Sequence, residues 1–523
     1  MKQKIALLLI LSLLLSLLSG CGSNEKAYVP TGDALVMENE EPTEAASNAG
    51  PQELTLAYYA ERSMNPIQST DYTNRALFSL IYQGLFSVDS DYNAVPILCK
   101  SFQASPDLKT FTFYIENATF SDGTPLTIED VLASFEAAKE NKNYVGRFTH
   151  VREMVITEDG GIRFSLATPF ENFPLLLDIP IMQATQVSDP APLGTGPYVF
   201  EDSLSGAHLR KTGNWWCKSD DLVITADVIN LIEAQNPSHI RDEFEFRDVG
   251  VVCANPCAAT YADYRCDLEL WDCDTGVMLY LGFNINYSQE DIFKDSDLRS
   301  AFTYAIDREA INEKFYNGHG KVATLPAEPG TPYYSNTLAE KYKFDSLRFI
   351  QVLSRTAKTD EPLRLLVNSD DSLRLSLAND IAETLTEYGL PTEVKSYYSA
   401  GYIEVFRAGN FDLYLGQVKL SANMDLSEFF RPYGDLARNG VSDAALYSRC
   451  QDALANRGNY YNLHREVAND GYLIPILFGT NAVYGKRGAA SNLTPSRDNV
   501  FYYDLGLRTE EVQLPERRTA TVE

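Results

Sequence analysis

LRLLVNSDDSLRLSLANDIAETLTEYGLPTEV, residues 363–394, is the stretch that decides the fold class. Hydrophobic residues alternate over 363–367, which predicts a strand, and then recur every four residues over 373–385, which predicts a helix. The helix is expected to end at Gly389, and Val394 begins another strand. A strand, a helix and a second strand in this order indicate a parallel pair of strands joined by the helix.

The same kind of pattern continues on both sides of this stretch. A short helix is expected over Tyr402–Ala408 and a strand over Phe411–Leu415, so the region as a whole is α/β. A longer helix is expected over 71–84, where a glycine closes it. Alternating or continuous hydrophobic residues predict further strands at 54–58, 86–88, 110–115, 151–156 and 162–166.

Two helix starts are marked by capping residues. Thr127 is expected to cap a helix, with Asp130 in the capping-box position and a hydrophobic staple between Leu126 and Val131. Asp307 follows one helical pattern and caps the next.

The N-terminus has the features of an export signal. Lys2 and Lys4 precede a short uncharged run, Ile5–Leu18, so we expect a secretory signal peptide over residues 1–20. The run ends in Leu-Ser-Gly-Cys, which looks like a bacterial lipobox. We therefore expect Cys21 to be acylated, for example with palmitate, and to become the mature N-terminus. The alternative is an ordinary signal peptide that is cut near Ser19 or Gly20, in which case Cys21 is incidental.

Residues 21–51 are interpreted as the lipidated cysteine and a flexible acidic linker, because they are rich in Ala, Pro, Ser and Gly and show no periodicity. The protein would thus be exported and anchored by its lipid to the outer face of the cell membrane, or to the periplasmic side.

The charge of the chain excludes some partners. Lys and Arg total 44 against 72 Asp and Glu, which gives a net charge of −28. Such a surface repels nucleic acid and anionic lipid headgroups, so no nucleic-acid partner is expected. The 31 Tyr and 26 Phe indicate a globular chain rather than a disordered one.

The cysteines do not have metal-binding spacing. Besides Cys21 there are seven, and those between Cys253 and Cys273 fit no zinc-ribbon or zinc-finger pattern. We expect structural thiols or one local disulfide, which export would permit.

Catalytic patterns are also missing from the sequence. It contains no Gly-x-Ser-x-Gly and no His-Glu-x-x-His, and the segment Gly479–Arg487 departs from a phosphate-binding loop in spacing and in its final residues. The five histidines are far apart. We therefore expect no enzyme, no cofactor and no metal site.

A series of short motifs runs along the chain and covers about residues 53–507. They are Ser63-Met-Asn-Pro66, Ile81-Tyr-Gln-Gly-Leu85, Ser105–Phe113, Phe120–Val131, Gly194-Thr-Gly-Pro-Tyr198, Leu281-Gly-Phe-Asn284, and Leu298–Ile311 with Gly318. In this order, the motifs resemble those of the family 5 extracellular solute-binding proteins of peptide and nickel ABC importers.

The resemblance implies a two-lobed, periplasmic-binding-protein-like fold of class II, of the large peptide-binding type. Lobe I would comprise residues 52–275 plus 476–507, with an extra subdomain near 85–185. Lobe II would comprise 277–475, and 508–523 would form a C-terminal tail. The two lobes would close on a ligand, and binding would shift the population toward the closed form.

The resemblance also implies partners: a peptide or small organic ligand, an ABC permease with its ATPase, and the membrane through the lipid. The protein is expected to be a monomer. The resemblance places candidate ligand contacts, by position, at Tyr58, Tyr59, Gly282, Asn284, Tyr398, Tyr402, Gln417, Lys419 and Phe478.

One departure from the family pattern concerns the ligand. In peptide-binding members, the loop near Gln417 carries Trp and then an Asp that pairs with the free amine of the peptide. Here Gln417 replaces the Trp, and the Asp position falls on Leu420 or Ala422. Lys419 would favour an anionic group if it faces the cleft. We therefore hypothesise that the ligand is not an ordinary free-amine peptide, or that its amine is held elsewhere.

Two other classes of function stay open from the sequence. The first is a signalling or interaction lipoprotein that senses a peptide or pheromone with the same fold. The second is an exported hydrolase, for which no nucleophile and base pair is evident. Neighbouring permease and ATPase genes would favour the importer, whereas a neighbouring sensor kinase would favour signalling.

Overall fold

The computed structural model describes residues 53–204, 206–217, 226–257, 264–356, 359, 361–434, 436–437, 440–487, 493, 495 and 497. The chain divides into two compact units, Met1–Gly50 and Pro51–Glu523, and every described residue lies in the second. The predicted signal peptide, the Cys21 anchor and the 508–523 tail lie outside the described residues. Every helix in the described ranges is too short or too polar to cross a bilayer.

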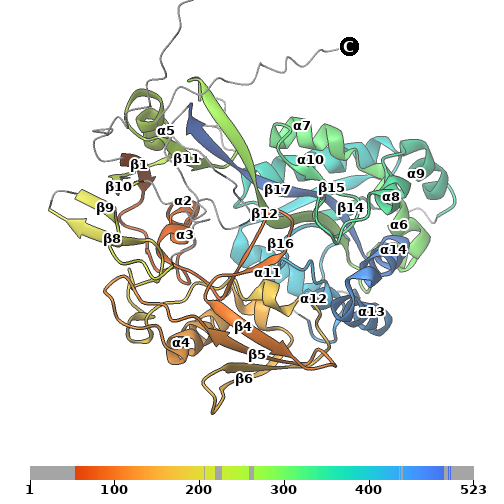
Figure 1. Cartoon of the computed structure of the whole chain (residues 1–523). Helices are drawn as coiled ribbons and strands as arrows, with labels where there is room; N and C mark the ends of the chain where they lie inside the picture. The colour runs from red at the N-terminus through yellow and green to blue at the C-terminus, as the bar shows by residue number, and fades with distance from the viewer. Residues whose placement is uncertain are drawn as a thin grey trace, which may run out of the picture. The chain divides into compact units, whose positions relative to one another are not determined.

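Strands and helices alternate along the described chain (Figure 1). The strands are β1 Glu53–Tyr58, β2 Phe86–Val88, β3 Ala94–Pro96, β4 Cys99–Ala104, β5 Thr110–Ile115, β6 Val151–Ile156, β7 Ile162–Leu166, β8 Tyr198–Ser203, β9 Gly206–Lys211, β10 Val228–Glu233, β11 Val251–Ala254, β12 Leu268–Phe283, β13 Lys321–Val322, β14 Leu363–Asn368, β15 Thr392–Tyr397, β16 Leu413–Lys419 and β17 Leu473–Lys486. The α-helices are α2 Tyr72–Ala76, α3 Phe78–Ile81, α4 Ile128–Lys139, α5 Pro237–Phe246, α6 Ser296–Ala305, α7 Arg308–Tyr316, α8 Asn336–Ala339, α9 Ser346–Leu353, α10 Ser372–Glu387, α11 Ser399–Ala408, α12 Ser427–Phe430, α13 Ala444–Ala455 and α14 Tyr460–Asp470. The short 3₁₀ helices are η1 Val145–Phe148, η2 Phe173–Leu176, η3 Ala184–Gln186, η5 Gln289–Lys294, η6 Glu340–Tyr342 and η7 Arg457–Asn459.

The largest sheet has the strand order β11-β17-β12-β16-β14-β15, with β13 beside β17. Its two long central strands, β12 and β17, run antiparallel side by side (Figure 1). β14 pairs in parallel with both β15 and β16, and α10 and α11 form the crossover connections. The α/β fold predicted from residues 363–415 is therefore confirmed.

Three smaller sheets are built from the first half of the chain. One has the order β1-β10-β9-β8, another the order β4-β5-β7-β6, and β2 with β3 forms a two-stranded ribbon. The strands predicted at 54–58, 86–88, 110–115, 151–156 and 162–166 all belong to these sheets.

The predicted helix caps are confirmed. At the start of α4, Thr127 and Asp130 form a capping box in which each side chain accepts from the other's backbone N–H. The Asp307 carboxylate accepts from the backbone N–H of Ala310 at the start of α7. The single helix predicted over 71–84 is wrong, because the chain forms two short helices, α2 and α3, that meet at Leu77.

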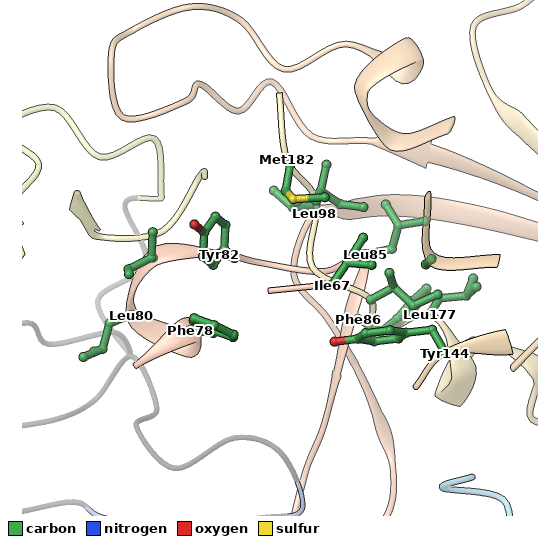
Figure 2. Close-up of a cluster of buried hydrophobic side chains, with 14 of the residues drawn as sticks. Ile67, Phe78, Leu80, Tyr82, Leu85, Phe86, Leu98, Tyr144, Leu177 and Met182 are labelled. Atoms are coloured by element: carbon green, nitrogen blue, oxygen red, sulfur yellow. The ribbon is translucent and has the colours of Figure 1, made fainter. Parts of the chain in front are cut away.

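The apolar core consists of separate clusters. The largest is built mainly from residues 54–231 and includes Phe78, Phe86 and Leu98, whose packing Figure 2 shows. A second cluster takes its residues from 279–477 and fills the space between the largest sheet and its helices. The boundaries predicted for the two lobes stay a prediction.

Candidate functional site

A large cavity opens among segments that lie far apart in the sequence. Its volume is about 730 Å³. The described lining includes residues of α2, η1, the middle of β12, the end of α7, the start of α10, the end of β16, α12 and the middle of β17. Ligand pockets are typically about 300–1,000 Å³, so the cavity has room for a small organic molecule or a short peptide.

The end of β16 supplies one wall of the cavity. Gln417, Val418 and Lys419 all line it. Gln417 and Lys419 are exposed, whereas the first residues of β16 are buried in the sheet. The Gln417 side-chain oxygen accepts a hydrogen bond from Arg374 in the first turn of α10.

A β-bulge in β12 forms the floor beside this wall. The register of β12 against β17 shifts between Asp274 and Val277, and Gly276 has φ +68°. A Cβ atom at Gly276 would lie 2.7 Å from a guanidinium nitrogen of Arg497. Arg497 in turn donates to the carbonyl of Leu420 at 2.9 Å. Only glycine therefore fits where the arginine packs on the bulge.

Asp425 also lines the cavity and is held by three donors. Its Oδ2 lies 2.8 Å from His150 Nε2, and its Oδ1 accepts from the backbone N–H and the hydroxyl of Ser427. Burial acts to raise the pKa of Asp425, but His150 and Ser427 outweigh it and the pKa is lowered.

A network of charged and polar groups adjoins the bulge through Asp274 and Arg497. The Tyr92 hydroxyl donates to Glu328 at 2.8 Å and is 3.2 Å from Asp274, which pairs with Lys321. The guanidinium carbon of Arg497 lies 5.8 Å from the centre of the Tyr92 ring. Glu328 is fully buried, and this burial, together with the charge of Asp274, raises its pKa to about 7.

Of the predicted ligand residues, the structure brings only Gln417 and Lys419 to the lining of this cavity among its described residues. Gly282, Asn284 and Phe478 lie within or at the end of the central strands. The Asn284 amide donates to the carbonyls of Gly409 and Phe411, so it fixes a turn.

The four predicted tyrosines also lie away from the described lining. Tyr58 and Tyr59 are buried at the end of β1, in two different apolar clusters. Tyr402 stacks on Phe406 within α11, while the Tyr398 side chain at the start of that helix is 75% exposed.

Several residues that the sequence did not single out line the cavity. They include Arg75 from α2, Lys142 and Arg147 around η1, and Arg497. Each comes from a short helix, a 3₁₀ turn or an irregular segment, so no periodic pattern marks them. The contact between His150 and Asp425 joins residues 275 positions apart.

The polar groups around Asp425 do not form a nucleophile and base pair. The carboxylate lies between His150 and Ser427 and hydrogen-bonds to both, so the histidine contacts the acid rather than the hydroxyl. Within the described ranges, no group of three or more His, Cys, Asp or Glu is placed to hold a metal ion, and the seven cysteines found there are free thiols.

Comparison with known proteins identifies the family. A model of bacterial extracellular solute-binding proteins, family 5 (middle part), matches residues 93–440, more than half of the chain. Protein XP55 of Streptomyces lividans is 28% identical over 49% of this chain and 49% of its own length. The glutathione-binding protein GsiB of Escherichia coli K12 is 24% identical over 54% of this chain and 56% of its own. The chain thus spans about half the length of these curated relatives.

The fold is shared with solved structures. A putative peptide-binding protein, AppA from Clostridium difficile, superimposes with a TM-score of 0.71 at 16% identity, covering 87% of this chain and all of AppA. The fold is therefore the two-lobed α/β fold of periplasmic binding proteins, as the sequence predicted. Together with the family match over 93–440, this shows that the chain belongs to the bacterial extracellular solute-binding proteins of family 5.

Proposed function

We propose that this protein is the lipid-anchored, extracytoplasmic substrate-binding component of an ABC importer. It captures a peptide or small organic solute and delivers it to a membrane permease. The single observation that supports this most is the 730 Å³ cavity within a family 5 fold. The names of similar proteins, which give glutathione for GsiB and peptides for AppA, support this class of solute.

Capture is expected to be a closing motion rather than a reaction. Lobe I, with its extra subdomain near 85–185, and lobe II, residues 277–475, are proposed to move about the β12 and β17 strands. The solute would contact Gln417 and Lys419 on one side and the η1 segment on the other. Because these contacts form together only in the closed form, the solute shifts the population toward closure.

The membrane attachment is proposed from the sequence, on the Leu-Ser-Gly-Cys pattern that ends at Cys21. Labelling of cells with radioactive palmitate should yield a labelled protein in the membrane fraction. The Cys21→Ser variant should lose the label and leave that fraction. Labelling that persists in this variant would contradict the anchor. We also propose that the protein is a monomer and that it has no nucleic-acid partner. The net charge of −28 supports the second of these points, because such a surface repels nucleic acid.

Two measurements test the proposed function: the identity of the solute bound to the purified protein, and the uptake of that solute by cells with and without the gene. Native mass spectrometry of the purified full chain should reveal a bound peptide or small solute. A strain that lacks the gene should lose uptake of that solute. If the solute binds but its uptake is unchanged, while a signalling response to it disappears, the signalling alternative replaces the importer.

A further inference from the structure

Two segments that lie far apart in the sequence meet along one edge of the cavity. The first, residues 86–176, carries β2 to β7 (β4, β5 and β6 are orange in Figure 1), and the second, residues 323–460, carries α8 to α13. In the described chain, the strands of the first segment pair only among themselves, and those of the second belong to the largest sheet. Contacts other than strand pairing therefore connect the two segments.

One of these contacts lies directly at the cavity. Asp425, in the second segment, lines the cavity, and so does Thr149, the residue before His150 in the first segment. The His150 Nε2 atom is 2.8 Å from the Asp425 Oδ2 atom, and the histidine is buried. The pair thus joins the two segments beside the space that a solute would occupy.

A second contact is made by Glu171 with the end of α13 and the start of η7. The Glu171 backbone N–H donates to the carbonyl of Leu454 at 2.8 Å. The Oε2 atom of Glu171 accepts from the backbone N–H of Arg457, also at 2.8 Å. Both hydrogen bonds run from one segment to the other, so they exist only while the segments are in contact.

Tyr92 makes a third contact from the turn between β2 and β3. Its hydroxyl donates to the Oε2 atom of Glu328 at 2.8 Å, and both residues are buried. The Tyr92 ring packs, together with Val88 and Leu175, in an apolar cluster whose other members come from residues 278–478. In the opposite direction, Leu454 packs in the largest cluster, which is built mainly from residues 54–231. Each segment therefore covers apolar surface of the other.

The polar part of this contact region suits a contact that can open. It contains the carboxylates of Glu171, Glu328 and Asp425 and the imidazole of His150, which water can hydrate when the segments separate. Interfaces between parts of a chain that move are more polar than a permanent core. Because the cavity lies beside these contacts, widening it on this side would break them.

We propose that residues 86–176 form a latch, which holds the cavity closed by its contacts with residues 323–460. His150, Glu171 and Tyr92 are the positioning residues of the latch. The proposal rests on the closing motion of the proposed function, and it gives the predicted extra subdomain a part in that motion. None of the three residues belongs to the described lining of the cavity, so the latch acts on closure and not through contact with the solute.

Hydrogen exchange tests the latch without a ligand, in the full chain freed of co-purified solute. The reporters are the backbone N–H groups of Glu171 and Arg457, whose acceptors lie on the other segment. An N–H group exchanges when its hydrogen bond opens, so the exchange rate measures the opening of the latch. We expect both reporters to be protected in the wild type.

The His150→Ala variant removes a different contact of the latch. If the contacts open together, both reporters should exchange at least about tenfold faster in this variant, the effect of losing one hydrogen bond to a charged group. The radius of gyration, measured by small-angle X-ray scattering, should increase as well. A role of His150 in stability alone would lower the melting temperature without enlarging the folded protein.

A second variant and a control accompany this one. Tyr92→Phe removes only the hydroxyl at the other end of the latch and should change both readouts in the same direction. It keeps the test open if His150→Ala fails to fold, which the melting temperature checks. His208→Ala is the matched control, because His208 pairs with Glu201 outside both segments. It should exchange and scatter as the wild type does.

Three results would overturn the inference. These are reporters that are unprotected in the wild type, reporter exchange that is unchanged in both variants, and faster exchange with the radius of gyration of the wild type. None of them refutes capture, which fails if the native protein holds no solute and supports no uptake. That failure would leave the measured latch in place, so the two proposals are tested separately.

Discussion

Two largely buried carboxylates, Asp425 and Glu328, accept hydrogen bonds from residues of the region near 85–185, yet their pKa values shift in opposite directions. Asp425 faces His150 and the two donors of Ser427, and its pKa is lowered. Glu328 accepts one hydrogen bond, from the Tyr92 hydroxyl, and lies near a second carboxylate, Asp274. Its pKa rises to about 7. The number and charge of the donors, rather than burial alone, decide whether a buried acid stays ionised.

The largest expected effect follows from removing the partner of Asp425. His150→Ala leaves that carboxylate with only the Ser427 donors and also removes the contact between His150 and the Phe170 ring. We expect the free energy of unfolding to fall by about 3 kcal/mol, measured by urea denaturation.

The matched control for this variant is His208→Ala. His208 pairs with Glu201 at a more exposed position, where an ion pair is worth less than about 1 kcal/mol. Equal losses in the two variants would show that the Asp425 contact is no stronger than a surface pair.

The second effect is a pH dependence that arises from Glu328. Its folded pKa of about 7 lies above the ordinary value of 4.5 for a glutamate, so the folded state binds the proton more tightly than the unfolded state does. Its contribution to stability is complete below about pH 4.5 and is lost as the pH rises toward 7. Glu328→Gln, which cannot ionise, should remove this loss and be more stable than wild type at pH 7 by about 2 kcal/mol.

Urea denaturation of both proteins between pH 4.5 and 8 measures this difference. The groups that face Glu328 are Tyr92, Asp274, Lys321 and Arg497, and none of them is altered in the variant. Parallel stability curves for the two proteins would contradict the raised pKa.

The smallest effect concerns the other oxygen of Asp425. Ser427→Ala removes one of its donors and keeps the backbone N–H in place. We expect a loss of about 1 kcal/mol at pH 7. Because the Asp425 pKa should rise toward its ordinary value in the variant, the loss of stability on acidification should be smaller than in wild type and should be complete at a higher pH. An unchanged acid transition would show that the hydroxyl does not stabilise the ionised carboxylate.

Much of the fold could be predicted because its signals are local. The alternation in β14, the four-residue repeat of α10 and the capping box at Thr127 each lie within one element. The helix predicted over 71–84 failed because hydrophobic periodicity does not register the break at Leu77, where α2 ends and α3 begins.

The site was less predictable, for a physical reason. Gln417 and Lys419 were predicted from the family resemblance, and both line the cavity at the end of β16; that they contact a ligand stays a prediction. Arg147 lies in the short 3₁₀ helix η1, and tertiary contacts position both it and Arg497. The predicted tyrosines fill apolar clusters or lie on the surface. A sequence does not distinguish such tyrosines from tyrosines that line a cavity.

The account depends on a solute being held in the cavity beside β16, and a crystal structure of the full chain with its co-purified solute tests this most directly. We predict electron density for the solute in contact with Gln417 and Lys419. Density for a solute bound elsewhere, with this cavity filled only by water, would contradict the account.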